Sequence, residues 1–233
     1  MKLTAPIYQL KRRARLLARE EAVALNVALD RIAVLEGYRA WSELAALHAS
    51  EGPASKLFRI LQPGELALIA ARPGLGKTLI GLELCYEAAK FGQHPVFFTL
   101  EYTHAECISK MNEIGNNASV LSQIDFDCSD QINAEHIASR VKSMPAGTLA
   151  VVDYLQLLDQ RRTDPPLQDQ ISALRSFARE NQAKLAFLSQ VDRSFTSKAQ
   201  NCPQATDIRL PNRLDLGLFD RMCFMGQSEV RIS

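Results

Sequence analysis

The sequence predicts an α/β fold in which a mainly parallel central sheet is flanked by helices and preceded by a small helical segment. Short apolar runs alternate with amphipathic helical patterns from residue 57 onward. The runs are apolar at consecutive positions, which is typical of strands covered on both faces in a parallel sheet. The chain has 233 residues, 47% hydrophobic and 23% charged, so it can bury one substantial core with an appendage beside it.

Residues 1–50 are expected to form a helical appendage. Leu10 and Leu17, and later Ile32 and Leu35, recur at helical spacing, and Gly37 is a suitable helix stop. A third short helix is expected around Trp41. Residues 51–56 are mostly small and turn-forming, so we assign them to a linker and residues 57–233 to the α/β domain.

Within the α/β domain, strands and helices are expected in alternation. The predicted strands are residues 65–71, 95–100, 149–152 and 184–189, with a possible terminal hairpin of 222–225 and 229–232. The predicted helices are residues 77–91, 104–114, a segment capped by Asn133, and a segment through 167–178. Ligands of such sheets bind at the carboxyl ends of the strands, so the residues that follow each strand are the candidate site.

Composition and charge exclude several classes of protein. The ordinary apolar content excludes a disordered, collagen-like or disulfide-framework chain. The net charge is +1, but residues 1–50 hold eight basic and five acidic residues, so a polyanion would prefer this end. Five scattered cysteines favour free thiols over zinc or disulfides. Without a leader or an apolar run of about 18 residues, we expect a soluble cytoplasmic protein with no membrane partner.

The sharpest motif lies between the first predicted strand and the helix after it. It reads Ala71-Arg72-Pro73-Gly74-Leu75-Gly76-Lys77-Thr78, and this context is the one that a phosphate-binding P-loop requires. Backbone N–H groups of such a loop and the helix N-terminus bind phosphates. Lys77 would reach the β- and γ-phosphates and Thr78 would hold Mg²⁺, so ATP and Mg²⁺ are the expected cofactors. Ala71 stands where the usual first glycine is expected; a turn without a ligand is the alternative.

Hydrolysis needs further groups, and three polar residues follow predicted strands. Asp153 is positioned to help hold the metal ion. Glu101 could act as a general base on the attacking water. Gln190 could donate a hydrogen bond to the γ-phosphate or to that water. Because polar residues at strand ends also serve as helix caps or solvated loop residues, that alternative stands for each of them.

Four ordered segments make the sequence similar to a known family. Residues 70–78, 98–101, 152–158 and 188–194 resemble, in the same order, motifs of the RecA-like ATPase domain of DnaB-type replicative helicases. The resemblance covers roughly residues 57–226 and implies a RecA-like P-loop NTPase fold. It also implies roles for Lys77 and Thr78 as phosphate and Mg²⁺ ligands, Glu101 as catalytic carboxylate, Asp153 as Walker B acid and Gln190 as γ-phosphate sensor. A hexameric ring around single-stranded DNA is the assembly that it implies.

Two departures favour an ATPase over an unwinding motor. The family supplies a basic finger from near its C-terminus, where this chain offers only Arg231. Residues 1–50 also do not resemble the family's N-terminal domain, and we expect them to bind an unknown protein partner. The alternative function is a nucleotide-gated switch or loader that binds DNA or protein; a recombinase-like or clock-like RecA relative is a weaker one.

Two loops are expected to face single-stranded DNA, because the family's channel loops correspond to residues 160–166 and 191–214. They carry six basic residues, namely Arg161, Arg162, Arg193, Lys198, Arg209 and Arg213. A solvated loop is the alternative interpretation. The basic run Lys11-Arg12-Arg13-Ala14-Arg15 lies on a predicted helix and could contact a phosphate backbone, or could simply form a solvated face.

Overall fold

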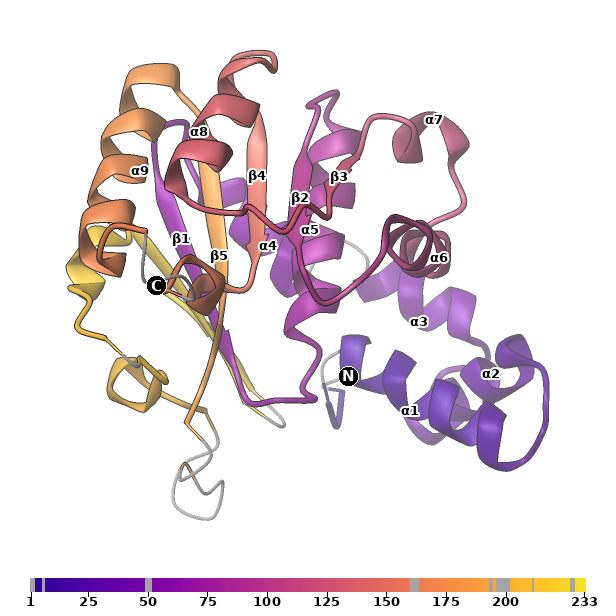
Figure 1. The fold of residues 1–233 in the computed structure, drawn as a ribbon. Coiled ribbons are helices and arrows are strands. Elements are labelled where there is room, and N and C mark those ends of the chain that lie inside the picture. Colours follow the sequence, from indigo (N-terminus) through magenta and orange to yellow (C-terminus); the bar gives the residue numbers. More distant parts are fainter. Residues whose placement is uncertain are drawn as a thin grey trace.

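A seven-stranded sheet forms the centre of the computed structural model, with strand order β3-β2-β4-β5-β1-β6-β7 (Figure 1). The structure describes residues 3–5, 7–48, 52–159, 164–192, 195, 202–210, 212–226 and 229–233. The strands are β1 (Leu66–Ala71), β2 (Val96–Thr99), β3 (Asp125–Asp127), β4 (Leu149–Asp153), β5 (Lys184–Gln190), β6 (Arg221–Met225) and β7 (Val230–Ile232). Strands β1 to β6 are parallel to one another, and β7 is antiparallel to β6. The predicted sheet and terminal hairpin are therefore confirmed.

Helices cover both faces of this sheet (Figure 1). They are α4 (Pro53–Ile60), α5 (Lys77–Lys90), α6 (His104–Ile114), α7 (Ala118–Leu121), α8 (Ala134–Lys142) and α9 (Leu167–Asn181), with short turns η1 (Leu155–Asp159), η2 (Ala205–Asp207) and η3 (Leu216–Leu218). Phe98 and Phe187 point toward α8 and α9, whereas Phe97 and Leu188 point toward α5. Adjacent strand residues thus enter opposite cores, which explains why the strands are apolar at consecutive positions.

Strand β3 is absent from the sequence-based expectation. It has three residues, Asp125, Phe126 and Asp127, and all are only half-buried at the edge of the sheet. Its aspartates are engaged by α8, because Arg140 binds Asp125 at 2.9 Å and His136 lies 2.8 Å from Asp127. A strand this short, held by long-range polar contacts, leaves no hydrophobic periodicity to detect.

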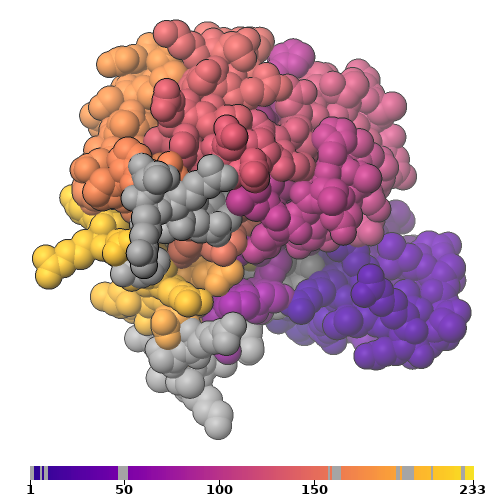
Figure 2. All heavy atoms as spheres, viewed as in Figure 1, coloured from indigo at the N-terminus to yellow at the C-terminus, as the bar shows by residue number. Residues whose placement is uncertain are grey.

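The first three helices form a unit with a core of its own. They are α1 (Ile7–Glu20), α2 (Leu25–Leu35) and α3 (Trp41–His48), and their buried residues are Leu10, Ala14, Ala28, Ile32, Ala33 and Leu44. Gly37 has a φ of +87° directly after α2, so the predicted helix stop is confirmed. Figure 2 shows this N-terminal unit, in indigo, as a lobe at one side of the molecule against the segments in magenta.

Helix α4 corrects the expectation that residues 51–56 are only turn-forming. It begins at Pro53 with Gly52 as its N-cap, and Leu57 and Phe58 are buried against α5. Proline suits the first helical position because its missing N–H is not needed there. The small residues at 52–55 therefore form the start of a helix. Within the described ranges, no helix is both long and apolar enough to cross a membrane.

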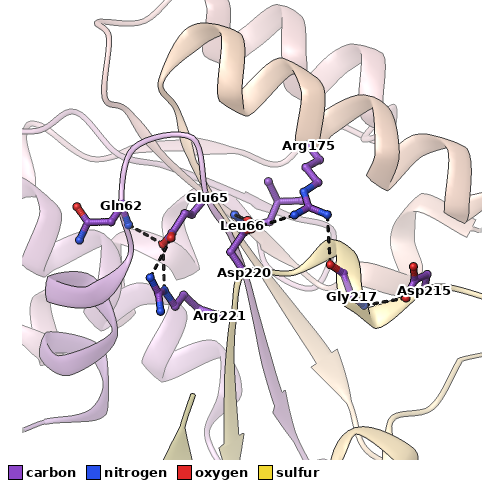
Figure 3. Close-up of polar contacts among 8 residues, drawn as sticks. All are labelled: Gln62, Glu65, Leu66, Arg175, Asp215, Gly217, Asp220 and Arg221. Atoms are coloured by element: carbon purple, nitrogen blue, oxygen red, sulfur yellow. Dashed lines mark hydrogen bonds and ion pairs between the residues drawn. The ribbon is translucent and has the colours of Figure 1, made fainter.

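A polar cluster fixes the amino ends of β1 and β6 (Figure 3). Arg221 donates two hydrogen bonds to Glu65, at 3.0 and 2.9 Å. Asp220 accepts one from the N–H of Leu66 at 2.9 Å and another from Arg175 of α9 at 3.0 Å. These contacts lie at the amino ends of the strands. Ligands of parallel sheets bind at the opposite, carboxyl ends, so this cluster is separate from the candidate site.

Candidate nucleotide-binding site

The loop between β1 and α5 has the backbone shape of a phosphate cradle. Gly74 and Gly76 have φ values of +81° and +86°, a region that residues with a Cβ rarely adopt. Ala71 is the last residue of β1 and pairs with both β5 and β6 in regular extended conformation. No glycine is needed at that position, which explains why the motif tolerates alanine there.

One buried carboxylate holds both polar residues that begin α5. Asp153, which has no exposed surface, accepts a hydrogen bond from Lys77 Nζ at 2.8 Å with one oxygen. Its second oxygen accepts one from the Thr78 hydroxyl at 2.7 Å. Lys77 is itself only 7% exposed. The contact arises because β4 and β1 end at the same edge, so that Asp153 faces the first turn of α5.

Glu101 lies at the same edge, just after β2. Its carboxylate is 3.9 Å from Lys77 Nζ, and its backbone N–H donates to the Thr99 hydroxyl at 3.1 Å. Partial burial raises the pKa of the Glu101 carboxyl; the nearby Asp153 raises it further, while Lys77 lowers it. Since about a third of the side chain remains exposed, this carboxyl can meet water at the mouth of the site.

Two tyrosines complete the surroundings of Lys77, and the sequence analysis did not single them out. The Tyr154 ring centroid is 5.0 Å from Lys77 Nζ. Burial, together with the charges of Glu101 and Asp153, raises the pKa of the Tyr102 hydroxyl, while the neighbouring Thr78 side chain opposes this effect. Each tyrosine directly follows a carboxylate at a strand end, and that adjacency was the available signal.

A cavity of about 430 Å³, large enough for a small ligand, opens over Lys77, Thr78, Glu101 and Tyr102, whereas the fully buried Asp153 lies behind its wall. Its lining is Arg12, Arg15, Pro73, Gly74, Gly76, Lys77, Thr78, Leu79, Leu82, Glu101, Tyr102, Lys110, Glu113 and Gln190. Gln190 reaches it from the end of β5, paired with Ala71 of β1. Of the predicted loop residues, Arg72 and Leu75 do not line this cavity, and Leu75 packs against the α5 core.

The donor atoms fit a magnesium ion carried by a nucleotide. Mg²⁺ prefers oxygen ligands and usually takes one or two from protein, with phosphates and water filling the rest. The Thr78 hydroxyl and the Asp153 carboxylate provide this kind of donor within 2.7 Å of each other. The described part of the chain has no group of three His, Cys, Asp or Glu side chains that could hold a metal ion by themselves.

The residues expected to face DNA are only partly described. Arg209 is exposed, and its backbone N–H donates to the carbonyl of Gln190 at 2.8 Å, so its backbone lies beside a residue that lines the cavity. Arg213 is also exposed but lines a different hollow, next to Gln168 and Asp215. The structure thus brings Arg209, but not Arg213, next to a cavity residue. Four of the predicted residues lie outside the described residues, namely Arg161, Arg162, Arg193 and Lys198.

Residues of α1 also line the cavity, which the sequence analysis missed. Arg12 and Arg15 belong to the basic run for which the sequence predicts either a contact with a phosphate backbone or a solvated face. Arg15 pairs with Glu113 of α6 at 2.7 Å, and Lys11 approaches Glu83 of α5 at 4.0 Å. This part of the run therefore faces α5 and α6 of the α/β domain, a packing that no local pattern encodes.

Comparisons with known proteins agree with this geometry. The family model described as DnaB-like helicase C-terminal domain matches residues 55–123 and 108–215. A replicative DNA helicase DnaB of Buchnera aphidicola subsp. Schizaphis graminum is 27% identical over 206 residues, covering 73% of this chain and 44% of that protein. The corresponding protein of Pasteurella multocida is 24% identical over 243 residues, covering 88% and 51%. The chain thus spans about half the length of these curated relatives.

Two solved structures have the same fold. One is a DnaB-like replicative helicase studied with primase, with a TM-score of 0.59 at 20% identity, covering 93% of this chain and 66% of that one. The other is a solved ATPase domain, with a TM-score of 0.56 at 20% identity, covering 78% of this chain and 80% of that one. At this identity the likeness establishes a shared RecA-like architecture.

Proposed function

The chain belongs to the family of DnaB-like helicase C-terminal domains, and on that basis we propose that it is a Mg²⁺-dependent ATPase. ATP would bind in the cavity at the carboxyl edge of the sheet. The observation that carries the proposal is the sharing of Asp153 between Lys77 and Thr78. A cation and a hydroxyl held by one buried carboxylate, behind a glycine loop at a helix N-terminus, suit a polyphosphate with its metal.

Each group has a distinct task in the proposed reaction. The loop N–H groups and Lys77 bind the phosphates and neutralise charge as the terminal phosphoryl group is transferred to water. Glu101 positions that water and takes its proton, which its raised pKa assists. Gln190, on β5 beside the loop, is the candidate that reports whether the terminal phosphate is present. When bound, Mg²⁺ supplies further charge neutralisation, with Thr78 and Asp153 holding it.

We extend the proposal to action on single-stranded DNA, in an oligomer such as the hexameric ring implied by the family resemblance. Support comes from the exposed Arg209, whose N–H is bonded to the Gln190 carbonyl and so lies near the proposed phosphate sensor. Positive groups that track a phosphate backbone beside a nucleotide sensor can couple the two ligands. The relatives named above carry the description of replicative helicases.

The test is ATP hydrolysis by the purified chain with Mg²⁺, with and without single-stranded DNA. We expect turnover that DNA stimulates and that Lys77→Ala abolishes. Lys90→Ala is a matched control, because Lys90 lies at the far end of α5 and pairs with Glu87. Turnover that persists undiminished in Lys77→Ala would contradict the proposal.

A second candidate function is a nucleotide-gated switch, and the position of α1 favours it. Arg12 and Arg15 bring the N-terminal unit to the wall of the cavity, so nucleotide could control how that unit is docked. A switch would bind ATP but hydrolyse it slowly, with no response to single-stranded DNA. The same assay, combined with a binding measurement, therefore separates the two functions.

A further inference from the structure

Two ion pairs fasten helix α1 beside the cavity. Lys11 Nζ is 4.0 Å from Glu83 of α5, and Arg15 Nη2 is 2.7 Å from Glu113 of α6. Lys11 and Arg15 are four residues apart, so they lie on one face of α1. Each forms an ion pair with a different helix of the α/β domain. Burial raises the pKa of the Glu83 carboxyl, although Lys11 opposes this effect. The helix is therefore held in a defined position relative to the phosphate-binding loop.

Arg12 lies between these two anchors and reaches the loop itself. A Cβ added to Gly74 would be 3.4 Å from its Nη2 atom and 3.7 Å from its Nη1 atom. The guanidinium thus lies directly over the glycine whose φ of +81° shapes the cradle. It also lines the cavity.

The cations that line the cavity differ in what already binds them. Lys77 is bonded to Asp153, Arg15 is paired with Glu113, and Lys110 lies 4.5 Å from the Tyr102 ring centroid. Arg12 is exposed, and among the described residues no carboxylate lies within ion-pair distance of it. Its planar fork of N–H donors is therefore available to a ligand of opposite charge.

We propose that Arg12 is a phosphate ligand of the nucleotide, supplied to the cavity by the N-terminal helical unit of the same chain. The proposal rests on the proposed ATP site. A guanidinium beside the loop's backbone N–H groups adds a charge-assisted contact to a phosphate, whose oxygens suit its parallel N–H donors. It adds to the cavity of Lys77 a cation from a part of the chain that the family model does not match.

The position of Arg12 makes nucleotide and α1 mutually dependent. Whatever Arg12 adds to nucleotide affinity, the nucleotide adds equally to the docking of α1, because coupling between two binding events is reciprocal. ATP, which carries one phosphate more than ADP, gains more from the extra cation. The N-terminal unit is accordingly held more tightly in the ATP-bound chain than in the free chain.

The first experiment compares MgATP and MgADP affinity by calorimetry for the full chain, Arg12→Ala and Arg19→Ala. Arg19 is an exposed arginine on the same helix that does not line the cavity. We expect Arg12→Ala to weaken ATP binding about tenfold, with a smaller loss for ADP, and Arg19→Ala to bind like the parent. Circular dichroism and thermal melting establish that each variant is folded.

The second experiment follows amide hydrogen exchange in α1. We expect MgATP to slow exchange across α1 in the parent chain, and this protection to disappear in Arg12→Ala at saturating MgATP. If the parent binds ATP and Arg12→Ala binds it within twofold, Arg12 is not a phosphate ligand and this inference fails alone. If the parent binds no nucleotide, the proposed function fails and this inference fails with it.

Discussion

Lys77 Nζ lies 2.8 Å from Asp153 Oδ1, and both groups are buried where β1 and β4 end. A charged pair in such a place is costly to break, because the remaining partner keeps its charge without compensation. The same carboxylate also accepts from Thr78 at 2.7 Å. One aspartate therefore positions both residues on which we base the ATP site, and its removal is the most informative single change.

Asp153→Ala should lower the free energy of unfolding by about 3 kcal/mol, near the lower end of the cost of breaking a buried pair. The lower end is expected because Lys77 lines an open cavity and Glu101 lies 3.9 Å away. Urea denaturation measures the loss. Glu101→Ala, which removes a more exposed carboxylate from the same site, is the control and should cost less than about 1 kcal/mol. Equal losses for both variants would argue against a special role for Asp153.

Glu101→Gln should separate binding from hydrolysis. The amide keeps the size of the side chain but cannot take a proton, so turnover should fall about 10²- to 10⁴-fold while ATP affinity stays within about threefold. Steady-state hydrolysis and calorimetry give the two values. A variant that hydrolyses ATP at the parental rate would remove Glu101 from the reaction.

The same residue predicts a pH dependence. Burial raises the pKa of the Glu101 carboxyl above its ordinary value, and a general base works only in its ionised form. Turnover should therefore rise with pH through that raised pKa and be lost as pH falls below it. In Glu101→Gln, the residual activity should no longer fall at low pH. If the fall persists in this variant, it reports the titration of another group.

Gly81→Ala should destabilise the fold and weaken the site together. A Cβ there would lie 2.8 Å from Leu188, 3.1 Å from Phe97 and 3.2 Å from Val151, so these side chains must repack or α5 must shift. Overpacking of this kind costs about 1–3 kcal/mol, and α5 begins with Lys77 only one turn earlier. Gly52→Ala, where nothing lies within 4 Å, should cost under about 1 kcal/mol. Unfolding curves and ATP affinity would be compared between the variants. A Gly81→Ala variant as stable as the parent would contradict the packing described.

Asp220→Ala should reduce stability without altering ATP affinity. It leaves the buried Leu66 N–H without its acceptor and Arg175 without its carboxylate, at a cost of about 1–3 kcal/mol (Figure 3). Asp220→Asn retains an oxygen that can accept from Leu66 and should lose less. Because this cluster lies at the opposite edge of the sheet from the cavity, a large loss of ATP affinity in a folded variant would contradict the separation of the two edges.

Local patterns in the sequence predict most of the sheet and the phosphate loop. The strand that ends at Ala71 and the helix that begins at Lys77 can be predicted because apolar periodicity and glycine spacing are local properties. Asp153 and Glu101 could be assigned to one edge because parallel strands end together. Their catalytic roles stay predictions. Local patterns do not predict β3, because its aspartates are held by Arg140 and His136 of α8, which lie further along the chain.

The placement of α1 is the clearest example of what the sequence could not provide. The run 11–15 is basic, and basic helices are commonly solvated or bind polyanions. Only the fold shows Glu83 and Glu113 opposite Lys11 and Arg15, since these acidic residues lie on α5 and α6 far along the chain. Helix α4 was missed for another reason, because Gly52 and Pro53 suit a helix start as well as a turn.

Calorimetric titration of the folded chain with MgATP tests the central claim most directly. The account predicts one nucleotide per chain, with binding lost in Lys77→Ala and weakened when Mg²⁺ is chelated. Absence of binding heat for the parent across several temperatures, or equal affinity in parent and Lys77→Ala, would contradict it.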